Sequence, residues 1–226
     1  MVRETRYYNN GDRYDGELTG EKRNGQGTYT FANGNRYEGQ WKNDTFDGKG
    51  IFYWKDGSKY DGNWKNGKKE GKGVYTTTNG MRYDGNWSND QYNGKGIFIW
   101  NDGARYDGEF KSNKFHGNGL FDWNKNGIKY DGKWNEGKKS GNGKLFLSNG
   151  TRYEGEFKNG NIEGKGVYFF NNGERYEGHF NNNELNGNGI YFFNNGDKTE
   201  GKFSKNIATG VHTKKCTNGL VQKITY

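Results

Sequence analysis

The sequence predicts an all-β repeat protein, an elongated and twisted antiparallel sheet built from stacked two-stranded hairpins. The segment YDGNW occurs at 60 and again at 83, and related segments start at 14, 37, 106, 130, 153, 176 and 199, a step of 23 residues with one extra residue before 130. A fixed period of this length indicates units that pack mainly against their neighbours. Proline is absent, so nothing interrupts a strand ladder. The chain is also 17% aromatic, with the rings at fixed repeat positions, whereas disordered chains are poor in aromatic residues.

The first half of each repeat is predicted to be a strand. In the copy that starts at Tyr60, the residues Tyr60, Gly62 and Trp64 alternate with polar residues and therefore share one face. We expect the tyrosines at the first position to form a continuous aromatic spine in place of a globular core: Tyr14, Tyr37, Tyr60, Tyr83, Tyr106, Tyr130, Tyr153 and Tyr176.

A second strand follows in the same repeat. After the glycine doublet GKG at 71–73, the run VYTT is rich in β-branched and aromatic residues. The repeat ends with Asn79-Gly80, a pair that tolerates the positive φ angles of a type I′ turn, and we expect a tight hairpin there and at its counterparts, including Asn126-Gly127. Glycine inside strands costs backbone entropy. An aromatic ring from a neighbouring strand is expected to cover the bare glycines.

Charges follow the same period. A basic residue precedes the first position of every copy and an acidic residue follows it, as in Lys59 and Asp61. These two rows share a face, so we expect cation and anion ladders that pair across strands. They cancel each other, and the formal net charge of +8 therefore resides in the loops and the tail.

Tyr-(Asp/Glu)-Gly-x-(Trp/Phe), followed by x-Asn-Gly-Lys-x-x-Gly-Lys-Gly, an aromatic strand and Asn/Asp-Gly, resembles the MORN repeat family (membrane occupation and recognition nexus). The resemblance covers nearly the whole chain and implies three regions: an N-terminal half repeat or cap at 1–13, nine repeats at 14–210 and a C-terminal capping hairpin at 211–226. It departs from the pattern at the insertion 124–127, at Thr199 in place of tyrosine, and after Gly210. Similar proteins act as scaffolds and adaptors at membranes, cytoskeletal structures and ciliary complexes, or as arrays fused to enzymes.

No catalytic chemistry is predicted. His116, His179 and His212 lie in different repeats without metal-ligand spacing, and we interpret them as solvated side chains. Cys216 lies four residues from His212, too far along an extended strand for a nucleophile and its base. The GKG doublets lack the Ser or Thr and the helix that a phosphate loop needs. We expect neither an enzyme nor a metal or cofactor.

The first functional hypothesis is a protein scaffold whose trough holds an amphipathic helix of a partner. The candidate anchors are large residues that the repeat does not require: Phe46, Tyr92 and Phe115 in the loop after the first strand, and Trp54, Trp100 and Trp123 after the second. The competing interpretation is that the tryptophans belong to the spine and the loop aromatics cover the hairpins.

The second hypothesis is binding to an anionic phospholipid surface, including phosphoinositides. The lysines that would carry it are Lys65, Lys68, Lys69, Lys72, Lys138 and Lys139. The competing interpretation is a solvated edge that keeps the sheet soluble.

Nucleic-acid binding ranks last among the functional hypotheses, since no RNA-binding or zinc pattern occurs. One cysteine and the absence of an apolar leader predict a cytoplasmic protein, and the resemblance implies a location peripheral to membrane or cytoskeleton. The C-terminal end, as an unpaired edge, is a candidate homodimer contact.

Overall fold

The strands account for most of the chain. The computed structural model describes residues 1–124 and 127–226. The chain forms two compact units, residues 1–114 and 115–226. The strands of the first unit are β1 (Val2–Tyr7), β2 (Arg13–Thr19), β3 (Lys22–Thr30), β4 (Arg36–Lys42), β5 (Thr45–Tyr53), β6 (Lys59–Lys65), β7 (Lys68–Thr76), β8 (Arg82–Ser88), β9 (Gln91–Ile99) and β10 (Arg105–Lys111). Those of the second are β11 (Lys114–Asp122, its first residue in the first unit), β12 (Lys129–Asn135), β13 (Lys138–Phe146), β14 (Arg152–Lys158), β15 (Asn161–Phe169), β16 (Arg175–Asn181), β17 (Glu184–Phe192), β18 (Lys198–Ser204), β19 (Ile207–Lys215) and β20 (Val221–Thr225).

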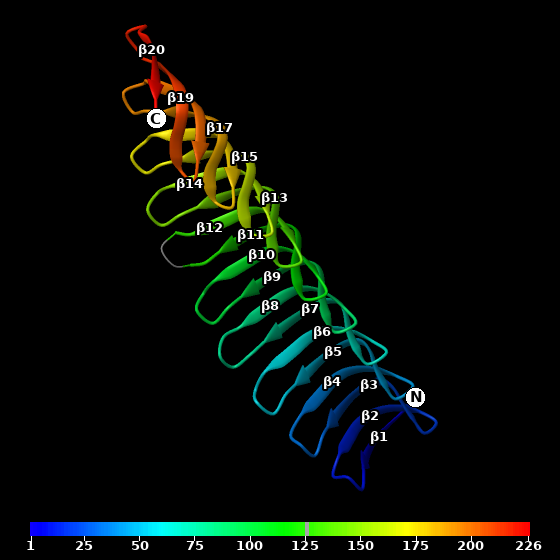
Figure 1. The fold of residues 1–226 in the computed structure, drawn as a ribbon. Helices are drawn as coiled ribbons and strands as arrows, with labels where there is room; N and C mark the ends of the chain where they lie inside the picture. The colour runs from blue at the N-terminus through cyan, green and yellow to red at the C-terminus, as the bar shows by residue number, and fades with distance from the viewer. Residues whose placement is uncertain (125–126) are drawn as a thin grey trace. The chain divides into compact units, whose positions relative to one another are not determined.

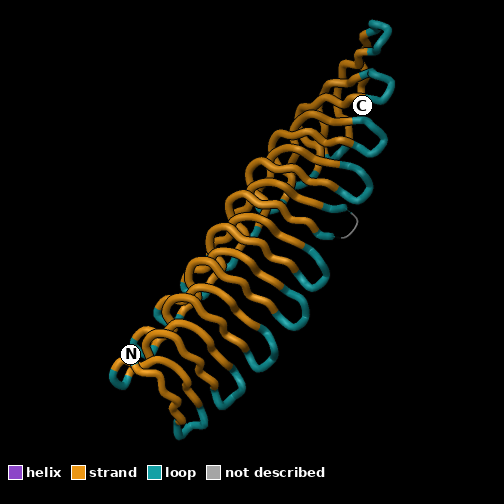
Figure 2. The backbone as a smooth tube through the Cα atoms, turned by 180° about the vertical axis from the view of Figure 1, so that it is seen from behind, coloured by secondary structure: helices purple, strands orange, loops and turns teal. Residues whose placement is uncertain are grey.

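Strand order follows sequence order in both units. In the first unit each strand from β1 to β10 pairs antiparallel with the next. In the second unit the same holds from β11 to β20. Consecutive hairpins therefore lie side by side (Figure 1), and the turns lie at the strand ends (Figure 2). The all-β class and the antiparallel hairpin array are confirmed. No helix in the described part of the chain has the length and apolar composition to cross a membrane.

The tight two-residue turns lie at the other end of the repeat from the one predicted. Between β6 and β7 the turn is Asn66-Gly67, and both residues have positive φ, +50° and +77°. Asn89-Asp90 takes the same conformation between β8 and β9. These are the type I′ turns of the array, because that turn type matches the twist of the strands it joins.

The Asn-Gly pairs form a different turn, and the prediction of type I′ geometry there is wrong. In the loop 77–81 only Gly80 has positive φ, +91°. Gly80 N donates to Thr77 O (3.2 Å), and Thr77 N donates to Met81 O (2.9 Å). This is the three-residue hairpin loop in which a single left-handed glycine follows the turn. The predicted Asn126-Gly127 turn lies partly outside the described residues, since 125 and 126 are not described.

The two glycines of the doublet have different functions. Gly71 has φ of +65°, and its counterparts in the other repeats also have positive φ. In the pairing of β6 with β7, Gly71 lies beside a register shift between Gly62 and Trp64. Gly73 pairs with Gly62, and the ring of Tyr60 lies against both, so that a Cβ on Gly73 would stand 2.5 Å from the ring. The ring comes from the first strand of the same hairpin. The expectation of a covering ring from a neighbouring strand therefore holds for Gly73 but is wrong for Gly62.

The ion pairs run along strands more than between them. Arg82 bonds Asp84 at 2.7 Å, and Arg175 bonds Glu177 at 2.7 Å, each pair lying within one strand. A guanidinium two residues from a carboxylate reaches it directly, because both side chains project from the same face. Glu154 also bonds Lys144 of the adjacent strand at 3.1 Å, but Lys144 does not belong to the predicted cation row, so this is not the predicted pairing of the two rows.

The interpretation of His212 as a solvated side chain is wrong, because His212 is 0% exposed. In β18, Thr199 occupies the first repeat position, where the other repeats have tyrosine. In β19, His212 occupies the position of the second glycine of the doublet. The imidazole fills the volume left by the missing phenol and lies against Gly201. Its Nε2 lies 2.8 Å from Lys202 O, just as the Tyr60 hydroxyl donates to Asn63 O (3.0 Å). One substitution compensates for the other.

Candidate functional site

Each hairpin has two faces with different chemistry. In the repeat that starts at Tyr60, the face we call the spine face carries Tyr60, Trp64, Lys69 and Tyr75, together with residue 77. The face we call the charged face carries residues 59, 61, 72, 74 and 76. Alternation along the strands separates the two sets, and the register keeps equivalent residues in rows across the strands.

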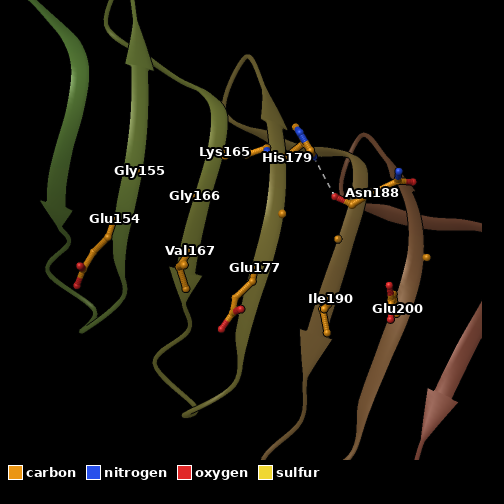
Figure 3. A pocket seen from close by; sticks show the side chains of 13 residues that line it. Glu154, Gly155, Lys165, Gly166, Val167, Glu177, His179, Asn188, Ile190 and Glu200 are labelled. Atoms are coloured by element: carbon orange, nitrogen blue, oxygen red, sulfur yellow. Dashed lines mark hydrogen bonds between the residues drawn. The ribbon is translucent and has the colours of Figure 1, made fainter.

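The charged face of the second unit contains an open cavity of about 740 Å³ (Figure 3). One row of its lining comes from five consecutive strands, β14 to β18, in which carboxylates alternate with aliphatic side chains. In register the row reads Glu154, Val167, Glu177, Ile190 and Glu200. A second row contains Lys165, His179 and Asn188.

The floor of this cavity is backbone. Gly155 pairs with Gly166, and Gly178 pairs with Gly189, between the two rows of side chains. Glycine is required here because the rings of the spine tyrosines press against these residues from the other face, where a Cβ on Gly178 would stand 2.6 Å from the Tyr176 ring. A surface that lacks side chains lies between two raised rows. Because side chains alternate between faces along each strand, these positions place no side chain on the charged face, and the hollow lies between side chains two residues apart on each strand.

Internal ion pairs hold part of the charge in the cavity. Glu154 bonds both Lys144 and Arg152 at 3.1 Å, and these bonds, that to Lys144 first, lower the pKa of Glu154. Glu177 bonds Arg175, whereas Glu200 is exposed. The lowered pKa keeps Glu154 ionised at neutral pH.

One further polar contact fixes a side chain in the second row. His179 Nδ1 lies 3.2 Å from Asn188 O, as the dashed line in Figure 3 shows. The imidazole is thereby held beside the glycine floor. The cavity presents three carboxylates, the Lys165 ammonium, one imidazole, one amide and two aliphatic side chains, which are groups for binding. Among the described residues no cluster of His, Cys, Asp and Glu could hold a metal ion.

The residues predicted as partner anchors lie on the spine face and do not line this cavity. Phe46 and Tyr92 were placed in a loop, but they lie within β5 and β9 and stack on Tyr37 and Tyr83, with centroids 3.8 and 4.0 Å apart. Phe115 lies in β11, at 5.2 Å from the Trp134 ring. All three are half-buried.

The tryptophans and the spine tyrosines extend the same stack. Trp54, Trp100 and Trp123 are half-buried and each lies beside the ring two residues before it, at 4.7, 4.5 and 4.3 Å. The eight tyrosines assigned to the spine are 0 or 1% exposed. Whether any of these residues binds a partner stays a prediction.

The lysines predicted to bind lipid divide into two groups. Lys65, Lys68, Lys72 and Lys138 are exposed. The Lys69 ammonium instead lies over four rings, including Trp54 at 5.0 Å and Trp87 at 4.8 Å, and the Lys139 ammonium lies over Tyr130 and Phe157. Desolvation lowers the pKa of both. The side chains of Lys69 and Lys139 therefore point toward the aromatic rings of the spine face.

Sequence reasoning did not find the cavity on the charged face. The signal was present, because the residue opposite each acidic position is often aliphatic, as in Ile51, Val74 and Ile97 of the first unit. What the sequence lacked was the register that places two glycine rows between the polar rows.

The fold and its faces define a class of protein, an antiparallel array of repeated hairpins with a shared aromatic spine. The chain belongs to the MORN repeat family: the family model matches residues 14–36, 37–59, 60–82, 83–105, 106–128, 130–152, 153–175 and 176–198. The copy that starts at 199, where threonine replaces tyrosine, is not among the matched residues.

Comparison with other proteins adds little to this. No curated protein matches the chain. One solved structure, the SAS-4 TCP domain of Drosophila melanogaster in complex with a proline-rich motif of Ana2, is 11% identical over 99% of this chain and 84% of that one, with a TM-score of 0.26. An inactive virginiamycin B lyase of Staphylococcus aureus with quinupristin is 12% identical over 98% and 69%, with a TM-score of 0.18. Likeness at this level says nothing about what the present chain binds.

Proposed function

We propose that this protein is a non-enzymatic scaffold that binds an amphipathic helix of a protein partner along its charged face. The observation that supports this most is the alternating row of carboxylates and aliphatic side chains over β14 to β18. Such a row suits a segment that presents apolar side chains together with Lys or Arg.

The spacing of the row favours a helix. Neighbouring strands lie about 4.8 Å apart, so the carboxylates at every second strand recur at roughly 10 Å. Seven residues of an α-helix rise about 10.5 Å. A helix with one basic residue per heptad, lying across the strands, would place successive cations near Glu154, Glu177 and Glu200, with Val167 and Ile190 between them.

The test uses a designed 21-residue amphipathic peptide with Lys once per heptad and Leu flanking each Lys, labelled for fluorescence anisotropy. We expect binding by the wild type that weakens with salt and weakens about twofold to thirtyfold in Glu177→Gln/Glu200→Gln, since two exposed ion pairs contribute about 0.2–1 kcal/mol each. Glu184→Gln, a carboxylate outside the cavity lining, is the matched control.

Two further reagents sharpen this test. A peptide with Glu in place of Lys should not bind, because it meets like charges. Val167→Asn should weaken binding of the Lys peptide, because it removes the apolar contact for Leu between Glu154 and Glu177 without changing the charge of the row. Equal binding of the Lys and Glu peptides would refute the proposal.

A second candidate function is peripheral binding to anionic membranes, favoured by the exposure of Lys65, Lys68 and Lys72. Lys65 and Lys68 face each other beside one turn. Co-sedimentation with phosphoinositide vesicles at physiological salt, lost in the triple Lys→Gln variant, would support it. Pelleting no better than with neutral vesicles would exclude it.

A further inference from the structure

Two pockets on the spine face, one in each unit, are built from the same repeat positions. The first is lined by Arg23, Tyr29, Phe31, Trp41, Asp44 and Phe46, with residues 45 and 67. The second is lined by Tyr168, Phe170, Phe180, Asn183, Leu185, Tyr191 and Asn206. Tyr29, Phe31, Trp41, Asp44 and Phe46 correspond in the repeat to Tyr168, Phe170, Phe180, Asn183 and Leu185. Their volumes nevertheless differ, about 260 Å³ in the first and 470 Å³ in the second.

A side chain of the chain itself occupies part of the first pocket. The Arg23 guanidinium lies over Tyr29 and Trp41, 4.8 and 4.4 Å from their ring centroids. It also pairs with Asp44 Oδ1 at 3.0 Å, and the Arg23 backbone N–H donates to the same oxygen at 2.9 Å. Stacking on rings and pairing with a carboxylate are what a guanidinium requires.

The second pocket lacks both partners of that ion pair. Ile162 replaces Arg23 and is buried at 7% exposure, and Asn183 replaces Asp44. The backbone bond persists, since Ile162 N donates to Asn183 Oδ1 at 2.8 Å. Within the described residues no cation lies over Tyr168, Phe170, Phe180 or Tyr191. The second pocket is larger because Ile162 fills less space than Arg23, and Phe180 and Leu185 are smaller than their counterparts Trp41 and Phe46.

The groups left at this pocket are aromatic and neutral, with donors at the rim. Asn183 Oδ1 and Asn206 Oδ1 are used by the backbone N–H groups of Ile162 and Leu185, so the amide NH₂ groups remain to donate. An incoming cation would meet two amide donors where Arg23 meets a carboxylate. An aromatic ring of a ligand would contact the four rings that line the pocket, Tyr168, Phe170, Phe180 and Tyr191. A hydrogen-bond acceptor next to that ring would contact the side-chain amides of Asn183 and Asn206.

We propose that this pocket, lined by Tyr168, Phe170, Phe180, Leu185 and Tyr191, binds an aromatic side chain of a protein partner, with Asn183 and Asn206 donating to an adjacent backbone carbonyl. The spine itself shows that such a ring can be added, because Phe46 and Tyr92 stack on Tyr37 and Tyr83 at 3.8 and 4.0 Å. Offset and edge-to-face ring contacts stabilise beyond the area they bury. This site lies on the spine face and does not depend on the charged-face cavity.

The test is NMR titration of the full chain, with N-acetyl-tryptophanamide as the probe and N-acetyl-argininamide as the comparison. We expect saturable shifts of the Asn183 and Asn206 side-chain amide signals with tryptophanamide at millimolar concentration. Argininamide should bind at least tenfold more weakly. The absence of saturation with tryptophanamide, or equal binding of argininamide, would overturn the proposal.

Variants that fill or recharge the pocket complete the test. Ile162→Arg recreates the arrangement of Arg23 and should abolish the tryptophanamide response. Leu185→Phe fills the same space with a ring and decides the question if the arginine variant does not fold. Asn183→Asp should shift the preference toward argininamide by restoring the carboxylate of Asp44. A tryptophanamide response that survives in a folded filling variant would place the probe elsewhere and refute the site. The charged-face variants should leave this response unchanged, so the two proposals fail independently.

Discussion

In β18 and β19, Thr199 and His212 stand where the other repeats have tyrosine and glycine, and this exchange can be tested by reversing it. His212→Gly removes a side chain that is 0% exposed, that lies 2.8 Å from Lys202 O, and whose ring centroid is 5.1 Å from that of Phe203 and 4.9 Å from that of Tyr226. Cutting a buried Phe or Trp back to Ala costs about 3–5 kcal/mol. Imidazole is smaller, but a lost hydrogen bond adds about 1 kcal/mol. We expect His212→Gly to destabilise β18 and β19 by about 3 kcal/mol.

The reciprocal variant and the double variant carry the argument. Thr199→Tyr alone forces a phenol into the volume that His212 occupies, an overpacking that costs about 1–3 kcal/mol. Together the two changes restore the arrangement of Tyr60 over its glycine pair, so the double variant should lie within about 1 kcal/mol of the wild type. The coupling energy between the two sites should then be about 3–6 kcal/mol in magnitude, at or above the upper end for residues in contact.

Hydrogen exchange is the suitable assay, because single hairpins of a repeat array open locally. The amides of β18 and β19 should lose protection in each single variant and regain it in the double variant. Amides of β14 and β15 provide an internal control. If the loss of amide protection in the double variant equalled the sum of the losses in the two single variants, the compensation would be refuted.

Three other outcomes are expected. Gly85→Ala, whose Cβ would stand 2.5 Å from Gly96 Cα and 2.6 Å from the Tyr83 hydroxyl, should cost more than 2 kcal/mol in urea unfolding, whereas Gly80→Ala, with open space but φ of +91°, should cost about 1 kcal/mol. Equal costs would contradict the close packing at Gly85. The bond from Tyr29 lowers the pKa of Asp12 from 3.8, so its contribution is present above that pH and is lost as pH falls below it. Acid unfolding of Asp12→Asn should be less steep than that of the wild type, and an unchanged slope would contradict this. Desolvation lowers the pKa of Lys69, so Lys69→Met should hold or raise stability at neutral pH by up to about 1 kcal/mol, and a large loss would show that the cation over the rings dominates.

Much of the fold could be predicted because each local preference repeats nine times. The tyrosine strands, the second strands and the burial of the spine follow from alternation, and they agree with the structure. The turns could not be assigned in the same way. Asn-Gly fits both a type I′ turn and a loop with a single left-handed glycine. The number of residues between paired positions decides between them, and that number depends on the register of the whole hairpin.

The candidate sites show the same limit more sharply. Arg23 and Ile162 occupy one repeat position, and nothing in the local sequence says that one fills a pocket and the other leaves it open. Phe46 and Tyr92 were expected at the surface of a loop, but they stack on the spine, because their strands bring the rings over Tyr37 and Tyr83. Residues that differ between repeats indicate positions where a binding site can form, but they do not indicate on which face of the sheet it lies.

The sequence by itself determined the repeat, its two strands and the residues of the spine, since periodic alternation of aromatic and polar residues leaves one way to bury the rings. The tertiary structure alone decided which side chains share a cavity. Glu154, Glu177 and Glu200 form one row with Val167 and Ile190, and Asn183 meets Tyr168 and Phe180, only after the strands pair in register. Contacts between residues of different repeats depend on that pairing, and no short stretch of sequence encodes it.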